Sequence, residues 1–319
     1  MTLPVTSRDL YNALKNKLGL EWVAGQTGAE RNLKGDFPGA ASQGLAGPLN
    51  YIHPNRIQII GRAELIYFSG LDRNLFLDVL EKLFYAQPAA VLLADCIAVD
   101  AQFIDSAEKS GTPLWRSSIP DKPLTDELQY FLTHALAERA TQHGVFMEVL
   151  GTGVLLTGNA ATGKSELALE LIARGHRLIA DDAPVFSRIA PDIISGSCPS
   201  LLQDFLEVRG LGVINIRTMF GDSAIKQEKY LRLIIHLQPM NDTDLKRVDR
   251  LRGSYSHTDV LGIPISEVAL PVAPGREMSI LVEVAVRQFI LLKKGYDATE
   301  EFILRQQQAI DSQLQQGSK

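Results

Sequence analysis

The stretch VLLTGNAATGKS, from Val154 to Ser165, contains the pattern G-x-x-x-x-G-K-S of a phosphate-binding loop after an apolar run. Residues 154–157 are typical of a strand, and residues 166–174 have the apolar spacing of a helix that Gly175 ends. In such a loop the glycines allow a tight turn whose N–H groups point at phosphate oxygens. The lysine brings a positive charge to the β- and γ-phosphates, and the serine offers a hydroxyl to Mg²⁺. The stretch therefore predicts a strand, a nucleotide-binding loop and a helix.

The residues on either side of this loop predict its neighbours. Residues 145–150 are apolar and are joined to the strand 154–157 by a glycine-containing turn, which favours a β-hairpin that leads into the loop. Residues 177–180 form another apolar run, which Asp181 and Asp182 follow. A carboxylate at such a strand end can hold Mg²⁺ or accept a proton, and two of them beside a triphosphate favour a raised pKa on one. The plainer interpretation is a turn that caps the next element.

Two further features could contribute to a site. His143 directly precedes the hairpin, although a lone histidine is more often a surface or packed residue than a catalytic one. The segment FLEVRGLGVINI, residues 205–216, places Glu207 and Arg209 beside two glycines. This pattern is equally consistent with backbone held close to a ligand and with a surface ion pair next to a turn.

The pattern of elements predicts an α/β fold in two domains. An N-terminal α/β domain is expected over residues 1–128, and a catalytic domain with a mixed sheet over residues 129–319. In the first part we expect strands at 56–60 and 89–93, a helix at 74–85 and a linker at 119–124. The second part is expected to start with a helix at 128–142. Those of the second part are strands at 231–237 and 268–272, a buried helix at 279–294 and a last helix capped by Asp297.

Composition limits the class of protein. The chain has 319 residues, 45% of them hydrophobic, and a formal net charge of −5, which argues against a nucleic-acid partner held by phosphate contacts. Its two cysteines, Cys96 and Cys198, lie far apart, which fits a reducing compartment. The start lacks a signal pattern, and the longest apolar stretch, near residues 89–99, is too short to span a bilayer. We therefore expect a soluble cytoplasmic protein with no membrane partner.

Together the motifs resemble the HPr kinase/phosphorylase family, bifunctional bacterial enzymes that phosphorylate a seryl residue of the phosphocarrier protein HPr. The resemblance runs nearly end to end and looks like the proteobacterial branch of that family. LEVRGLG, residues 206–212, is its most specific part. The other matching stretches are YIHPNRIQIIGRAEL, HGVFMEVLGTGVLLTG, SELALELIARGHRLIADD, LPVAPGR and EVAVRQF.

The resemblance implies the roles of particular residues. The phosphates of ATP would be held by Gly158, Asn159, Ala160, Ala161, Thr162, Gly163, Lys164 and Ser165. Mg²⁺ would be held by Ser165 and Glu207, and the catalytic residues would be His143, Lys164, Asp182 and Arg250. Asp182 would take the proton of the seryl hydroxyl and return it in the reverse reaction, in which inorganic phosphate is consumed and pyrophosphate is released. The resemblance also implies HPr as the protein substrate, a homohexamer, a role in carbon catabolite regulation, and a nucleotide site like that of phosphoenolpyruvate carboxykinase.

This sequence departs from the family pattern at three places. The loop has Ala160 and Ala161 where the family usually has Ser and Gly, and a left-handed backbone at Ala161 would cost about 1–2 kcal/mol. Glu277 stands where the family often has Asn, and its negative charge would disfavour inorganic phosphate. The spacing within residues 240–252 is shifted, which weakens the choice of Arg250 over its neighbours.

Two rival interpretations belong to other functional classes. The first is a different phosphate-loop enzyme, such as a GTPase, a small-molecule kinase or an enzyme with a carboxykinase-like reaction, although no N-K-x-D guanine motif occurs. The second is a regulatory module that binds nucleotide or partner without catalysis. The intact Lys164, Ser165, Asp182 and Glu207 argue against the second interpretation.

Overall fold

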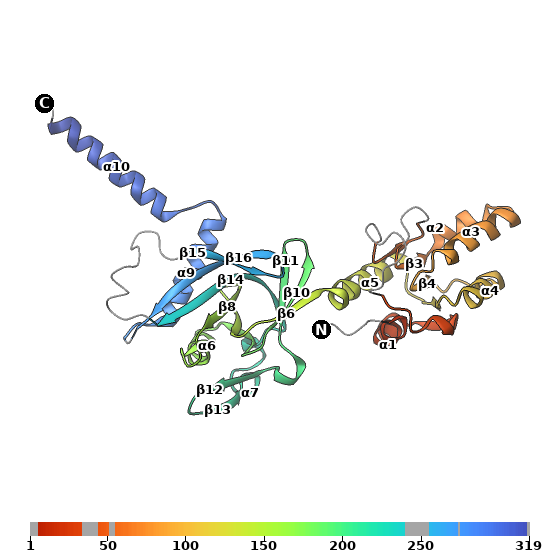
Figure 1. Ribbon diagram of the computed structural model, residues 1–319, viewed down its shortest axis with the longest axis horizontal. Helices are drawn as coiled ribbons and strands as arrows, with labels where there is room; N and C mark the ends of the chain where they lie inside the picture. Colours follow the sequence, from red (N-terminus) through yellow and green to blue (C-terminus); the bar gives the residue numbers. More distant parts are fainter. Residues whose placement is uncertain (1–5, 34–43, 51–54, 240–254, 274, 318–319) are drawn as a thin grey trace. The chain divides into compact units, whose positions relative to one another are not determined.

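The structure is a computed structural model and describes residues 6–33, 44–50, 55–239, 255–273 and 275–317. The chain forms two compact units, Met1–Ala137 and Glu138–Lys319, and each is described by itself (Figure 1). Both units combine helices with a sheet, so the predicted α/β class is confirmed. Within the described ranges, no helix combines the length and the apolar character that a membrane crossing needs.

The first unit is built on a five-stranded sheet with the order β1-β5-β4-β3-β2. Its strands are β1 (Glu21–Ala24), β2 (Ala46–Pro48), β3 (Ile57–Ile60), β4 (Ala90–Leu93) and β5 (Leu114–Arg116). Its helices are α1 (Ser7–Leu18), α2 (Arg62–Ser69), α3 (Arg73–Tyr85), α4 (Ala101–Ser110) and α5 (Asp121–Leu136), with a 3-10 turn η1 (Gln26–Gly28) after β1. The predicted strands at 56–60 and 89–93 and the predicted helix at 74–85 are confirmed as β3, β4 and α3.

Helices cover both faces of this sheet. One face packs against leucines of α1 and α5, and the other packs against aromatic and aliphatic side chains of α2, α3 and α4. Because both faces are covered, the central strands consist almost wholly of buried apolar residues, such as the run AVLL of β4. The first unit is therefore a three-layer α/β/α arrangement.

The connection between the units differs from the prediction of a linker at 119–124 and a helix at 128–142. Helix α5 already begins at Asp121, with Pro123 in its first turn. A proline is tolerated there because the first N–H groups of a helix have no intrahelical acceptor. The helix remains in the first unit because its leucines enter that core, namely Leu124, Leu128 and Leu132. The chain then forms strand β6 (Glu138–Thr141), which pairs with β10, so the first compact unit extends beyond residue 128 to Ala137.

The second unit contains a nine-stranded mixed sheet and a separate two-stranded hairpin. The sheet strands after β6 are β7 (Val145–Val149), β8 (Thr152–Gly158), β9 (Arg177–Ala180), β10 (Val185–Ala190), β11 (Ile193–Ser197), β14 (Glu228–Pro239), β15 (Tyr255–Val260) and β16 (Ile263–Val272). The hairpin is β12 (Phe205–Val208) and β13 (Gly212–Asn215), and the helices are α6 (Lys164–Ala173), α7 (Ile216–Phe220), α9 (Met278–Lys293) and α10 (Ala298–Gly317). The predicted strands at 231–237 and 268–272 lie within β14 and β16.

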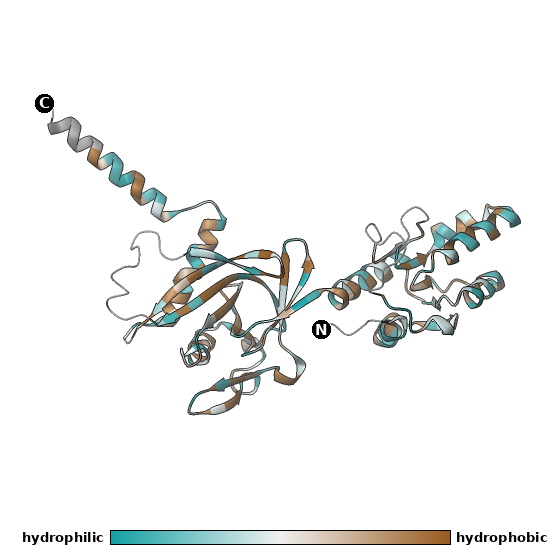
Figure 2. Cartoon of the chain, in the orientation of Figure 1, coloured by the Kyte–Doolittle hydropathy of each residue, from teal (hydrophilic) through white to brown (hydrophobic). Residues whose placement is uncertain are grey.

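Strand β14 organises this sheet. It runs parallel to β8 and β16 and antiparallel to β11, which confirms the predicted mixed sheet. Strand β7 forms the predicted antiparallel hairpin with β8 and also pairs antiparallel with β9. As a consequence, the start of β7 and the ends of β8 and β9 meet at one edge. Hydrophobic residues are frequent on the strands, whereas α10 has many hydrophilic residues (Figure 2).

Helices α6 and α9 cover one face of the sheet and are joined by a polar cluster. Glu283 of α9 is buried, and its carboxylate accepts hydrogen bonds from Arg174 Nε at 2.7 Å and Arg174 Nη2 at 3.0 Å. The buried His176 ring places Nε2 3.1 Å from Glu283 Oε1. Chiefly because of the bonds from Arg174, the pKa of Glu283 is lowered from 4.5 to about 2.

This cluster predicts an acid-dependent loss of stability. A carboxyl whose pKa falls on folding stabilises the protein above its unfolded pKa and loses that contribution as the pH drops to its folded pKa. Glu283→Gln should lower the free energy of unfolding at pH 7 by about 1–2 kcal/mol, a range that allows for the half-exposed arginine. The deficit should shrink as the pH falls from 4.5 to about 2, as measured by denaturant unfolding at each pH. The exposed Glu228→Gln is the control, and a deficit independent of pH would contradict the interpretation.

Candidate active site

The phosphate loop lies between β8 and α6, as the sequence predicts. Gly158 ends β8 with φ +147°, and a Cβ there would come within 2.7 Å of the Leu237 carbonyl oxygen on neighbouring β14. Gly163 is the N-cap of α6 with φ +80°, a left-handed conformation that suits glycine. These two positions explain why the pattern needs glycine at both ends of the loop.

Ala161 also has a left-handed backbone, with φ +64°. The sequence comparison with the family pattern anticipates this conformation, because glycine is usual at this position. A side chain with a Cβ makes the conformation unfavourable by about 1–2 kcal/mol. Ala160 is not among the positive-φ residues, so only one of the two alanines carries this strain.

Lys164 and Ser165 begin α6 and face the loop. The ammonium group of Lys164 donates hydrogen bonds to the carbonyl oxygens of Gly158 and Asn159, each at 3.0 Å. The loop therefore curves around the lysine, which places its positive charge inside the turn. The N-terminal end of α6 adds its own unpaired N–H groups to the same place.

Asp181, at the end of β9, connects this loop to the hairpin β12–β13. One carboxylate oxygen lies 3.5 Å from Ser165 Oγ, and the other accepts a 2.9 Å hydrogen bond from the backbone N–H of Glu207. Burial raises the pKa of Asp181 above its usual value, and the neighbouring Asp182 raises it further. Sequence reasoning anticipates a raised pKa on one of the two aspartates but selects only Asp182 for the site. Two adjacent carboxylates in the sequence are the signal for a raised pKa. In the structure it is the more buried of the two, Asp181, whose pKa is raised.

Asp182 has the opposite environment. Its side chain is 82% exposed, and its backbone has φ +65°. His143 Nδ1 lies 3.7 Å from Asp182 Oδ1, and the N–H of Gly144 donates to the Asp182 carbonyl at 3.3 Å. Two residues that are far apart in the sequence and were both predicted for the site are thus neighbours.

The hairpin β12–β13 forms one wall of the site. Leu206 and Val208 point into the core beneath α6, so the alternating Glu207 faces the other way. Glu207 and the following Arg209 line the same pocket as the phosphate loop, which favours the ligand interpretation of this charged segment over an ordinary surface pair. The pocket measures about 430 Å³ and is lined by Gly144, Ala160, Ala161, Thr162, Gly163, Lys164, Ser165, Glu166, Asp181, Asp182, Glu207 and Arg209.

The other predicted residues are not among those that line the pocket. Arg250 is outside the described residues, as is the whole segment 240–254. Arg276 and Glu277 are exposed at the start of α9 and do not line the pocket. His143 is likewise not among the lining residues and reaches the site through Asp182.

Comparison with known proteins identifies the family. The family described as HPr Serine kinase N terminus matches residues 5–132, and that described as HPr Serine kinase C-terminal domain matches residues 134–306. This chain belongs to the HPr kinase/phosphorylase family. The HPr kinase/phosphorylase of Xanthomonas axonopodis pv. citri (strain 306) is 46% identical over 306 residues, which cover 96% of this chain and 97% of that one. The HPr kinase/phosphorylase of Xanthomonas oryzae pv. oryzae (strain PXO99A) has the same identity and coverage.

Among solved structures, the Hpr(Ser) kinase/phosphatase from Coxiella burnetii is 34% identical, with a TM-score of 0.45, over 51% of this chain and 98% of that chain. Membership of the HPr kinase/phosphorylase family confirms the predicted enzyme class, a kinase and phosphorylase of HPr. It also decides against the non-catalytic module and the GTPase among the rival interpretations. The resemblance seen in the sequence is thereby confirmed.

The strain at Ala161 is testable by a pair of matched variants. Ala161→Gly should raise the free energy of unfolding by about 0.5–1 kcal/mol, because the removal of the left-handed penalty outweighs the loss of stability from the greater unfolded-state entropy of glycine. Ala160→Gly should lower it by about 0.5–1 kcal/mol, because that position has no such penalty. Denaturant unfolding of both variants measures the two effects, and a change of the same sign in both would contradict the assignment.

Proposed function

We propose that this pocket transfers the γ-phosphoryl group of ATP to a seryl hydroxyl of HPr, and that it also returns the phosphoryl group to inorganic phosphate with release of pyrophosphate. The observation that carries the proposal is that Lys164, the hydroxyl of Ser165 and the carboxylates of Asp181, Asp182 and Glu207 all line one pocket. The pocket volume of about 430 Å³ lies within the range of small-molecule sites. Membership of the HPr kinase/phosphorylase family supports the same pair of reactions.

The nucleotide would be held by residues 158–165. Their N–H groups and the N-terminus of α6 favour a polyphosphate, and Lys164 is positioned to neutralise the charge that develops on the transferred group. Arg209 lines the pocket and brings a second positive charge to its rim. The likeness of this site to that of phosphoenolpyruvate carboxykinase and the role of Arg250 stay predictions.

The residues present fit a magnesium ion. Among the described residues, no group of three His, Cys, Asp or Glu side chains could hold a metal by itself. Mg²⁺ does not need such a group, because it is usually bound by one or two carboxylates together with substrate phosphates. The hydroxyl of Ser165 and the carboxylates of Asp181 and Glu207 supply such oxygens at the pocket. When bound, the ion would neutralise charge on the phosphates.

Asp182 is the residue best placed to move the proton. Both oxygens of Asp181 are near Ser165 Oγ or the Glu207 N–H, whereas the carboxylate of Asp182 is exposed to an approaching hydroxyl. Asp182 would accept the proton of the seryl hydroxyl during phosphorylation and return it to the same oxygen in the reverse reaction. His143, 3.7 Å away, would orient that carboxylate.

This role is testable in both directions of the reaction. Asp182→Asn should lower kcat for HPr phosphorylation and for phosphate-dependent dephosphorylation by about 10²–10⁴-fold each, because the same group acts in both. The exposed position of the side chain predicts unchanged stability and ATP affinity. Transfer from labelled ATP and release of pyrophosphate measure the two rates, with the exposed Asp192→Asn as the control. Full kinase activity in folded Asp182→Asn would contradict the assignment.

The outward face of the hairpin β12–β13 supports a docking surface for the protein substrate. Val213 lies directly across the hairpin from Glu207, so the two side chains are on one face. Val213 is 67% exposed and Leu211 at the hairpin tip is 69% exposed, and Phe205 is also exposed. Hydrophobic residues are visible on this hairpin in Figure 2. An HPr molecule that brings its seryl group into the pocket would cover these side chains, which explains why apolar residues are exposed there.

Docking through this face predicts a selective effect on substrate affinity. Val213→Ser should raise KM for HPr by about tenfold, the cost of losing a buried apolar contact of roughly 1–2 kcal/mol. The KM for ATP and the kcat at saturating HPr should stay unchanged, because Val213 does not line the pocket. Val284→Ser, at an exposed position of α9, is the matched control. Equal KM values for HPr in the two variants would exclude the hairpin as the docking surface.

The homohexamer implied by the family resemblance and the cytoplasmic location expected from the composition stay predictions.

A further inference from the structure

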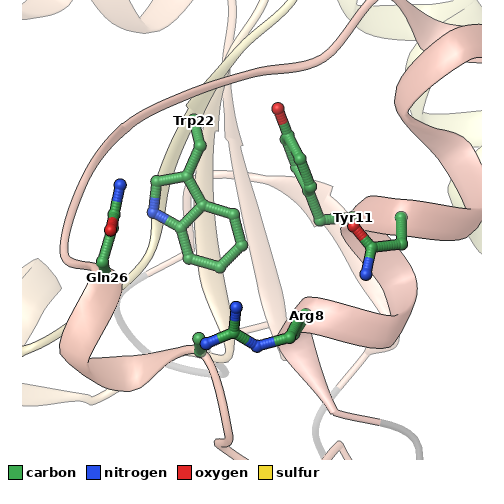
Figure 3. A pocket seen from close by; sticks show the side chains of 6 residues that line it. Arg8, Tyr11, Trp22 and Gln26 are labelled. Carbon is green, nitrogen blue, oxygen red and sulfur yellow. The ribbon is translucent and has the colours of Figure 1, made fainter.

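A second pocket is lined by residues of the first unit alone. It is formed by α1, β1 and η1, measures about 210 Å³, and is lined by Arg8, Tyr11, Asn12, Trp22, Gln26 and Ala29. Figure 3 shows the indole of Trp22 in its centre, with Gln26 on one side, Tyr11 on the other and Arg8 below. Aromatic rings with a few polar groups around them are typical of small-ligand sites.

The aromatic part of this pocket is held rigidly. The rings of Tyr11 and Trp22 are 5.0 Å apart with an interplanar angle of 70°, and both pack on the fully buried Trp115. The indole N–H of Trp22 donates to the Ala24 carbonyl at 2.9 Å, and the hydroxyl of Tyr11 donates to the Leu20 carbonyl at 3.2 Å. The polar atoms of both rings are therefore engaged inside the protein, and the rings offer a preformed apolar surface.

The rim of the pocket has the opposite character. Within the described residues, the side-chain amides of Asn12 and Gln26 make no hydrogen bond, and neither do the terminal guanidinium nitrogens of Arg8. Each amide supplies two donors and an acceptor, and the guanidinium supplies further donors. A ligand on the ring surface would thus meet hydrogen-bonding groups at its edge.

Charge limits the ligand further. The guanidinium of Arg8 forms an ion pair with Glu30, with 2.7 Å between Nε and Oε1, and among the described residues no other charged side chain lines the pocket. The charges of this pair compensate each other, and Lys15, whose ammonium group lies 5.7 Å from the centre of the Tyr11 ring, is not among the lining residues. The volume has room for about seven water molecules, which suits one small ring and is below the usual size of a cofactor site.

We propose that this pocket binds a neutral sugar ring in the form of a free monosaccharide. The C–H face of a pyranose carries partial positive charge and packs on the negative face of an indole. Its hydroxyl groups project from the ring edge, where the groups of Asn12, Gln26 and Arg8 lie. All residues that line this site belong to the first unit.

The two tryptophans of the chain make this site directly observable. Trp22 lines the pocket and Trp115 packs behind it, and the chain has no other tryptophan. Titration of the full-length protein with methyl glucoside, methyl galactoside and methyl mannoside should change the intrinsic fluorescence with a millimolar dissociation constant for at least one of them. Saturation-transfer NMR should show contact through the C–H face of the same sugar. Absence of any change by both methods would overturn the proposal.

Matched variants assign the binding to this pocket. Asn12→Ala and Gln26→Ala should each weaken the sugar by about tenfold, the loss of roughly one hydrogen bond. Asn16→Ala, an exposed position one turn further along α1, should leave the affinity unchanged. Equal affinities in all three variants would place the binding elsewhere and overturn the assignment. If glucose 6-phosphate bound more tightly than the methyl glycosides, the proposed preference for a neutral ligand would be wrong. If adenosine bound more tightly than they do, the pocket would be a site for a planar nucleobase instead of a sugar.

Discussion

The carboxylate of Asp181 connects the parts of the chain that form the candidate active site. One oxygen lies near the hydroxyl of Ser165 at the start of α6, and the other accepts the N–H of Glu207 in the hairpin β12–β13. The buried face of the hairpin packs against the core beneath α6, and this hydrogen bond adds a polar contact between Glu207 and the residue that lies next to Ser165. Placing a carboxylate in this half-buried position is unfavourable without a cation, and its raised pKa reflects this. The arrangement favours a site in which folding leaves a negative charge for a bound ion to neutralise.

Strand order brings the remaining residues to the same place. Strands β8 and β9 are both antiparallel to β7, which lies between them. Their carboxyl ends and the amino end of β7 must therefore lie at one edge of the sheet. This explains why His143, which precedes β7, lies beside Asp182, which follows β9. An antiparallel entry to the phosphate loop thus contributes a histidine that a parallel βαβ entry would place at the opposite edge.

The sequence could predict those parts of the site that depend on local constraints. The loop from Gly158 to Ser165 is recognisable because each of its motif residues meets a local need: the glycines allow the tight turn, the lysine supplies a positive charge and the serine supplies a hydroxyl. The hairpin before it follows from two apolar runs and a glycine turn. By contrast, β6 was expected to be helical, and its strand conformation depends on pairing with β10, more than forty residues away in the sequence. The burial of Asp181 depends in the same way on a hairpin that is distant in sequence, so the pair alone could not show which aspartate is buried.

The backbone of Asp182 explains how two adjacent carboxylates acquire different environments. With φ +65°, Asp182 has a left-handed conformation that aspartate tolerates better than most residues. In an extended strand, successive side chains point to opposite faces, and β9 would continue that alternation. The left-handed residue instead turns the chain at the edge of the sheet, where its carbonyl accepts the Gly144 N–H while its side chain remains in solvent. Asp181 is thereby left inside, next to the loop and the hairpin, and Asp182 outside, next to His143. The left-handed conformation of this one residue thus gives two adjacent carboxylates different surroundings.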